Sequence, residues 1–178
     1  MKKIISLLLL VTSLSLNAQI TKNNWLVGGG ISFSYSKSKP EGAVDSEAFN
    51  INLSPDIGYF IWDKFAFGSR LDFDLNHYKS DNGNSNFKRL LVSPFLRFYF
   101  LDEEKMVNPF IEGSYRFSLI NENNSQEFSA KGGIAIFLNN SVAYEIFLNY
   151  LNSTTQNQYI GSHTLLLGIG IQVHLKKN

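Results

Sequence analysis

Apolar and polar residues alternate with a period of two along most of this chain, and no other feature constrains its fold as strongly. A period of two is typical of a β-strand with one apolar face, whereas an amphipathic helix repeats about every 3.6 residues. One face of the first such segment carries Trp25, Val27, Ile31, Phe33 and Tyr35. The alternation returns in seven later segments, which begin near Phe49, Phe65, Arg89, Ile111, Phe128, Val142 and Thr164. The sequence therefore predicts eight strands.

The connections between these segments alternate in length. The long polar ones are Lys37–Glu47, Lys79–Asn86, Asn121–Gln126 and Asn152–Tyr159, and the short ones are Trp62–Lys64, Asp102–Met106 and Asn139–Ser141. Outer-membrane barrels place short turns on the periplasmic side and longer loops outside. Strands of roughly 10 to 14 residues also suffice for a tilted strand to cross a bilayer. We expect an all-β fold, an eight-stranded antiparallel up-and-down transmembrane barrel.

A soluble carrier of the lipocalin type is the main alternative, and it would turn the bulky apolar face inward. An interior of eight strands is only just wide enough for side chains to fill, which favours small residues inside. The polar face is rich in Gly, Ser, Ala and Asn, while the apolar face is crowded with Phe, Tyr, Leu and Ile. Charged residues make up 17% of the chain, against about 25% in soluble domains. Both observations favour the membrane barrel.

Composition excludes several classes of function. The chain has no Cys, which removes disulfides, Cys-ligated metals and thiol nucleophiles. The formal net charge is +1 and no basic cluster stands out, so we expect no nucleic-acid partner.

The N-terminus has the pattern of a secretory signal peptide. Lys2 and Lys3 precede an apolar run over residues 4–16, and Ala18 is a small residue at the expected cleavage point. The run is too short to cross a bilayer as a helix, which needs about 20 residues. We expect residues 1–18 to be removed and residues 19–178 to form the mature barrel domain, exported from the cytoplasm.

The polar face carries charged residues of both signs, which we expect to line the interior. This predicted set comprises Arg70, Asp72, Asp74, Arg97, Glu112, Arg116, Lys131 and Glu145, and Asp56 lies on the same face. Unpaired charges in a narrow interior are costly, so mutual pairing is the expected arrangement. A polar pathway for ions or protons is the alternative.

Aromatic residues near the predicted strand ends fit the girdles that flank the apolar band of membrane barrels. The expected girdle comprises Trp25, Tyr59, Trp62 and Phe100 on the periplasmic side, and Tyr35, Phe117, Tyr150 and Tyr159 on the outer side. Pro55 and Pro94 fall within strands and donate no ladder hydrogen bond. We expect a bulge or a strand shift near each.

Three segments resemble the outer-membrane β-barrel domain family of small porin-like proteins, akin to the OmpA and OmpX barrels. They are Ser54–Gly68, Ser93–Phe100 and Pro109–Gly113. The first pairs a Pro-x-x-Gly-Tyr-Phe strand with a short turn and a second alternating strand. The resemblance implies a monomer in the outer membrane of a Gram-negative bacterium, which contacts outer-membrane lipids, assembly machinery and periplasmic chaperones. It implies no single activity.

Catalytic groups were sought among the histidines, because some small outer-membrane barrels modify lipids with a rim histidine. His77 and His163 fall near the outer ends of the third and eighth segments, which sequential strand order keeps apart, and His174 falls at the periplasmic end. We expect no enzyme, no cofactor and no metal site. The predicted role is structural or one of surface interaction, with a narrow pore for water, ions or small solutes as the alternative and a lipid-modifying enzyme or a soluble carrier as weaker ones.

Overall fold

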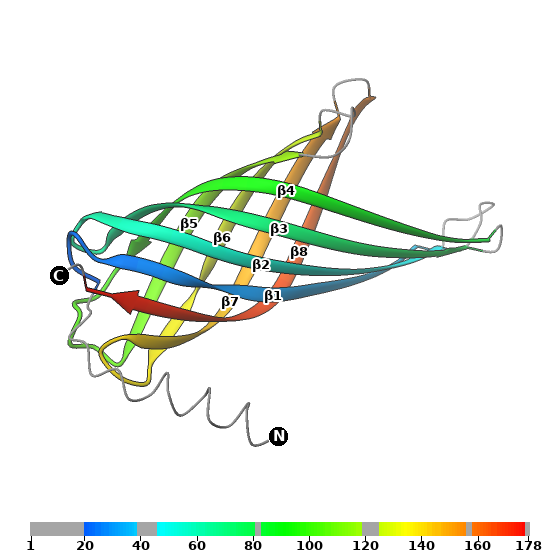
Figure 1. Ribbon diagram of the computed structural model, residues 1–178. Helices are drawn as coiled ribbons and strands as arrows, with labels where there is room; N and C mark the ends of the chain where they lie inside the picture. The colour runs from blue at the N-terminus through cyan, green and yellow to red at the C-terminus, as the bar shows by residue number, and fades with distance from the viewer. Residues whose placement is uncertain (1–19, 39–45, 81–82, 119–124, 156–157, 177–178) are drawn as a thin grey trace, which may run out of the picture.

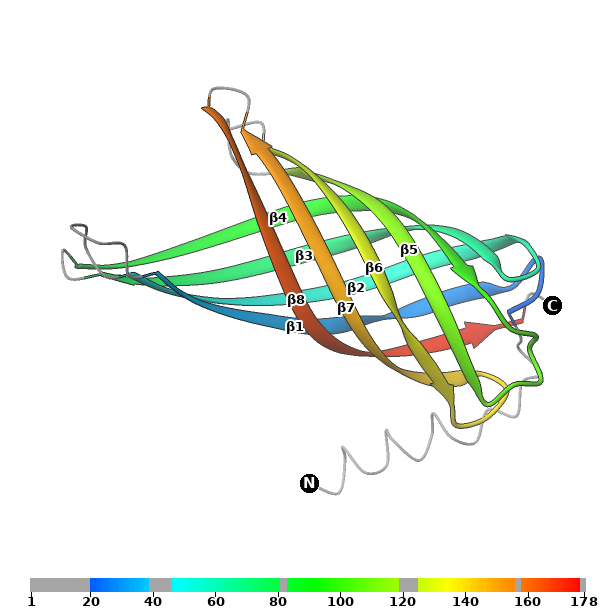
Figure 2. The same ribbon diagram turned by 180° about the vertical axis from the view of Figure 1, so that it is seen from behind.

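The computed structural model describes residues 20–38, 46–80, 83–118, 125–155 and 158–176, and these form a closed barrel. Eight antiparallel strands follow one another in sequence order around it (Figures 1 and 2). They are β1 (Trp25–Ser38), β2 (Ser46–Trp62), β3 (Phe65–Ser80), β4 (Gly83–Tyr99), β5 (Val107–Ser118), β6 (Ser125–Phe137), β7 (Val142–Thr155) and β8 (Gln158–Leu175). The predicted fold class is confirmed. The predicted signal peptide, residues 1–18, lies outside the described residues and stays a prediction.

The two ends of the barrel differ. The start of β1, the end of β8 and the connections between β2 and β3, β4 and β5, and β6 and β7 lie at one end, which we call the turn end (Figure 1). The opposite end is called the loop end. In the described part of the chain, no helix is long and apolar enough to cross a membrane.

The strands run further toward the loop end than the sequence predicted. The expected connection Lys79–Asn86 is mostly strand, because β3 continues to Ser80 and β4 begins at Gly83, with Lys79 paired to Asn84. Likewise, Thr155 of β7 pairs with Gln158 of β8, inside the connection expected over Asn152–Tyr159. The prediction was wrong here because ladder hydrogen bonds join backbone groups and continue through polar residues that carry no apolar alternation.

The barrel is closed only over part of its length. Pairing between β1 and β8 reaches Phe33 and Leu167, and pairing between β4 and β5 reaches Leu91 and Ser118. Beyond these points the described strands form two separate extensions, one from β1–β4 and one from β5–β8, which diverge in both views (Figures 1 and 2). The loop end is therefore a wedge between two sheets.

The expected distortions at Pro55 and Pro94 are absent from the described strands. Pro55 pairs with Gly29 on one side, and the register between β2 and β3 is the same before and after the proline. Pro94 pairs with Ser69, and the register between β4 and β5 is likewise kept. Each proline loses ladder partners on one side only, because the N–H group that proline lacks would point toward a single neighbouring strand. The register shifts lie elsewhere, between Phe60 and Trp62 and between Ser153 and Thr155.

Exposure alternates along the strands with the period of the sequence. In β7, Ile146 and Leu148 are 52% and 51% exposed, whereas the alternating residues Glu145 and Phe147 are 2% and 3% exposed. Large apolar side chains are exposed in this way on all eight strands, far beyond the patches that a soluble monomer presents. The outer surface is therefore an apolar belt, which contradicts the soluble-carrier alternative, in which that face would point inward.

Candidate functional site

The inward face of the strands collects charged side chains in the middle of the barrel. The structure places all eight residues of the predicted set in the interior and buries each of them: Arg70, Asp72, Asp74, Arg97, Glu112, Arg116, Lys131 and Glu145. Asp56 is buried there as well. Two further members, Arg89 and Glu127, were missed by the sequence reasoning, although Arg89 shares the parity of Arg97 and Glu127 shares that of Lys131.

Glu112 of β5 is the centre of the mid-barrel cluster. Its carboxylate lies 2.7 Å from Nη1 of Arg70 on β3 and 2.7 Å from Nη2 of Arg97 on β4. Nζ of Lys131 on β6 lies 3.4 Å away. One carboxylate therefore contacts cations from three strands, and it ties together both neighbours of β5 and the strand beyond β4.

The same cluster reaches across the interior to the other wall. Arg70 also pairs with Asp56 of β2 at 3.2 Å, and Nε2 of Gln172 on β8 donates to that carboxylate at 3.1 Å. Arg97 pairs with Glu145 of β7 at 2.6 Å. These contacts join β2 to β8 and β4 to β7, so side chains bridge the barrel at this level.

A second cluster lies nearer the loop end. Asp74 of β3 accepts from Arg89 and from Arg116, each at 2.9 Å, and from Nδ2 of Asn52 at 2.7 Å. Glu127 of β6 pairs with Arg116 at 2.7 Å and also with Arg89. Two cations and two anions thus form a closed ring of ion pairs drawn from four strands.

Both clusters are nearly balanced in charge. Five cations and six anions of the described chain take part: Arg70, Arg89, Arg97, Arg116 and Lys131 against Asp56, Asp72, Asp74, Glu112, Glu127 and Glu145. Taking a charge out of water is costly, and removing one partner of a buried pair costs about 3–5 kcal/mol. Removing any one of these side chains would therefore leave a buried charge without its partner.

The turn end of the interior is filled by aromatic rings. Tyr99 of β4 lies 6.1 Å from Phe60 of β2 and 5.9 Å from Phe110 of β5, between ring centroids. The guanidinium of Arg97 lies 4.6 Å from the centroid of Phe110, which joins this aromatic plug to the mid-barrel cluster. We use the name aromatic plug for Phe60, Phe95, Tyr99, Phe110 and Phe147, all of which are buried. Phe95 and Phe147 extend the plug into the mid-barrel cluster, where they contact Arg70 and Lys131.

The polar face of the sequence predicts small and polar residues inside, and this plug differs from that prediction. The signal was present, because Phe95 lies between Ser93 and Arg97 on the inward parity. Room for the rings comes from inward-facing glycines, since a Cβ at Gly68 would collide with Phe95 and one at Gly168 would collide with Phe147.

The three histidines lie apart from one another. His174 is fully buried, with its ring 5.8 Å from Phe60 and its Nδ1 3.4 Å from the carbonyl oxygen of Ser141. His77 contacts Asn86 at 2.7 Å, and His163 contacts the Tyr150 hydroxyl at 2.7 Å. His174 thus packs within the turn end of the interior, and no two of the histidines contact each other in the described structure.

The predicted girdle residues lie on the outer surface, except Tyr159, whose side chain the structure does not describe. Trp25 and Tyr59 pack edge to face with centroids 5.1 Å apart, and Trp62 packs against Phe65. Phe100, Tyr35, Phe117 and Tyr150 are exposed, while the side chain of Tyr159 lies outside the described residues. Their placement at a bilayer interface stays a prediction.

Two turns at the turn end are joined by an ion pair. Nζ of Lys64 lies 2.5 Å from the carboxylate of Asp102. This contact lowers the pKa of the Asp102 carboxyl group, first through the hydrogen bond and then through the positive charge. The pair links the β2–β3 turn to the β4–β5 connection on the exposed rim.

Comparison with known proteins relates this geometry to transmembrane barrels. No protein-family model and no curated protein matches the chain. Among solved structures, OprG of Pseudomonas aeruginosa superposes with a TM-score of 0.54 at 13% identity, over 92% of this chain and 100% of that one. Neisserial surface protein A gives 0.50 at 16% identity, over 84% and 96%.

A protein from the de novo design of transmembrane β-barrels gives a TM-score of 0.50 at 9% identity, over 88% of this chain and 99% of that one. At such identities the likeness concerns the fold alone. It agrees with the strand order, the closed barrel and the apolar outer belt. The chain therefore has the fold of the small eight-stranded outer-membrane β-barrels.

Proposed function

We propose that this protein is a non-conducting integral barrel of the outer membrane of a Gram-negative bacterium, with a structural or surface-interaction role and no catalytic one. The observation that carries the proposal is the filled interior. The mid-barrel cluster bridges opposite walls, and the aromatic plug occupies the turn end behind it. A pore would need a continuous path of water past both.

The width of the barrel supports a closed interior. Eight strands leave space that side chains can fill, whereas wide water-filled channels need more strands. Arg97 and Tyr99, on adjacent inward positions of β4, are 1% and 0% exposed. Any solute crossing the barrel would have to displace the contacts of Arg97 with Glu112 and Glu145.

The orientation follows the rule for such barrels, in which short turns face the periplasm. The turn end would then face inward and the two diverging extensions would face outside. The apolar belt would contact outer-membrane lipids. Residues 1–18 would direct export, periplasmic chaperones would bind the exported chain, and the outer-membrane assembly machinery would insert it. One closed barrel needs no second copy, and a monomer is the proposed state.

Electrical recording in a planar lipid bilayer tests this proposal. The wild-type protein is expected to give no steady openings. A variant that removes part of both barriers, Arg97→Ala with Phe110→Ala, is expected to conduct, while the outward-facing Phe67→Ala is expected to stay silent like the wild type. Heat-modifiable gel migration of each protein checks that it has folded. Steady openings of the wild type would overturn the proposal in favour of the narrow pore.

A further inference from the structure

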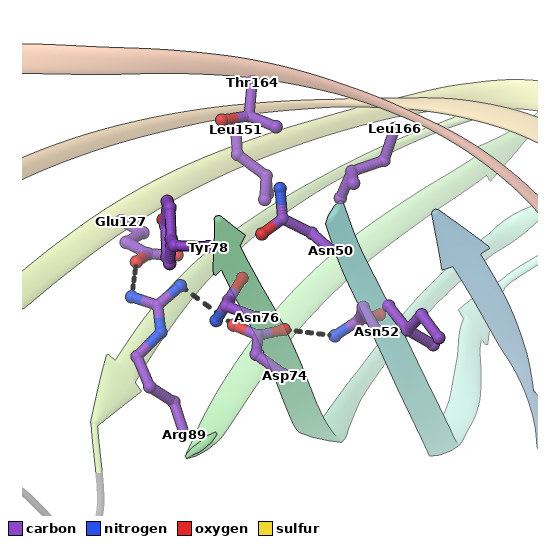
Figure 3. Close-up of a pocket in the computed structure, with 11 residues that line it drawn as sticks. Asn50, Asn52, Asp74, Asn76, Tyr78, Arg89, Glu127, Leu151, Thr164 and Leu166 are labelled. Atoms are coloured by element: carbon purple, nitrogen blue, oxygen red, sulfur yellow. Dashed lines mark hydrogen bonds and ion pairs between the residues drawn. The ribbon is translucent and has the colours of Figure 1, made fainter. Parts of the chain in front are cut away.

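The wedge between the two extensions contains a cavity directly above the loop-side ion pairs (Figure 3). It has a volume of about 240 Å³ and is partly open to solvent. Asp74, Arg89 and Glu127 form its floor, where they are held by one another (Figure 3). None of the residues of the mid-barrel cluster or of the aromatic plug lines this cavity.

The cavity offers hydrogen-bonding groups on two sides, from Asn50, Asn76 and Tyr78 of β2 and β3 and from Thr164 of β8. The side-chain amide of Asn76 and the hydroxyl groups of Tyr78 and Thr164 make no hydrogen bond to any described residue. Asn50 donates through its nitrogen to Ser34 at 2.9 Å, which leaves its carbonyl oxygen available. An amide both donates and accepts, and a hydroxyl does too, so these groups suit a ligand that carries several hydroxyl groups.

The charges of the floor argue against an ionic ligand. Asp74 and Glu127 are each paired with both Arg89 and Arg116, and Asp72 also contacts Arg116 at 3.6 Å, so both guanidinium groups are already neutralised. A charged ligand would have to break one of these pairs and leave the other partner uncompensated. A neutral ligand keeps the ring of ion pairs intact.

The side of the cavity formed by β7 and β8 carries two apolar side chains besides Thr164. Leu151 of β7 and Leu166 of β8 face the asparagines across the cavity (Figure 3). A pyranose ring has this same division, with C–H groups on its face and hydroxyl groups at its edge. The volume lies between the roughly 150 Å³ that holds a benzene ring and the roughly 300 Å³ at which drug-sized pockets begin. A single hexose lies in this range.

We propose that this cavity binds one neutral hexose unit, either as a free sugar or as the end of a longer glycan. The inference rests on the proposed function only in placing the loop end outside the cell. The floor orients the ligand through the ordered ion pairs, the side chains of Asn50, Asn76, Tyr78 and Thr164 recognise hydroxyl groups, and Leu151 and Leu166 pack against the ring face.

Titration calorimetry of the folded full-length chain in detergent tests the proposal with glucose, galactose and N-acetylglucosamine. Saturable binding of at least one of them is expected, with a dissociation constant in the millimolar range or below. Asn76→Leu and Thr164→Val, which each remove a free hydrogen-bonding group, are expected to weaken binding about tenfold, because a missing bond of about 1.4 kcal/mol changes affinity tenfold. Asn84→Leu, an exposed position outside the cavity, is the matched control and is expected to bind like the wild type.

Glucuronate and glucosamine provide the charge test, and both are expected to bind at least tenfold more weakly than the neutral sugars. A short oligosaccharide ending in the bound sugar separates the sources: retained binding assigns the end of a glycan, and lost binding assigns a free sugar. The proposal is overturned if none of the three neutral sugars binds, if a charged analogue binds as tightly, or if Asn76→Leu and Thr164→Val both bind like Asn84→Leu. Since these titrations need neither orientation nor conductance, their failure would leave the proposed closed barrel standing.

Discussion

At the scale of single residues, a few carboxylates organise the interior by contacting several cations each. Glu112 contacts Arg70, Arg97 and Lys131 and is itself buried. Such a residue can be recognised in part from sequence, because its parity shows that it points inward. Its partners cannot be recognised, because they depend on the stagger between strands. Arg89 was left out of the predicted set for the same reason, because its partners Asp74 and Glu127 lie on other strands.

Replacing Glu112 by Gln is expected to lower the free energy of unfolding by about 3–5 kcal/mol, because three buried cations lose their shared anion. Urea unfolding of the barrel in detergent measures this loss through the midpoint and slope. Glu104→Gln, on the exposed connection between β4 and β5, is the control and should change the free energy by less than about 0.5 kcal/mol. An equally small change for Glu112→Gln would show that the cluster contributes little to stability.

At the scale of strands, the alternation of residues identified the faces correctly but not the local geometry of pairing. The two prolines were expected to shift the register and did not, because the strand opposite Pro55 adapts instead. Gly29 faces Pro55 with a positive φ of 155°, and a Cβ there would come within 2.7 Å of the Pro55 Cα atom. This adjustment involves two strands at once, so the sequence of one strand could not reveal it.

Gly29→Ala is therefore expected to destabilise the barrel by about 1–3 kcal/mol, through backbone strain and the collision with Pro55. Gly113→Ala is the matched control, because a Cβ at Gly113 would meet no atom within 4 Å. Urea unfolding of both variants measures the difference. If the two variants unfold at the same urea concentration, close approach between β1 and β2 at this point is not a requirement of the fold.

At the scale of the whole molecule, the structure is a barrel with an apolar exterior, a charged middle and an aromatic turn end. The closed eight-stranded form and the outward apolar face were predictable, because alternation and the rhythm of the connections are properties of the whole chain. The aromatic plug and the divergence of the two extensions were not. The plug depends on glycines that face rings from other strands, and the divergence depends on where pairing stops between β4 and β5 and between β8 and β1.

The central claim is that the apolar belt faces lipid, and the absence of native cysteine allows it to be measured directly. Spin labels would be attached at Ile146→Cys and Leu148→Cys on the belt, and at Asn84→Cys on the loop end as the water-exposed reference, in protein reconstituted into lipid vesicles. Collisions with oxygen, which concentrates in lipid, are expected to dominate at the two belt positions, and collisions with a water-soluble nickel complex at position 84. Nickel collisions at 146 and 148 as frequent as those at 84 would contradict the claim, because they would place the belt in water.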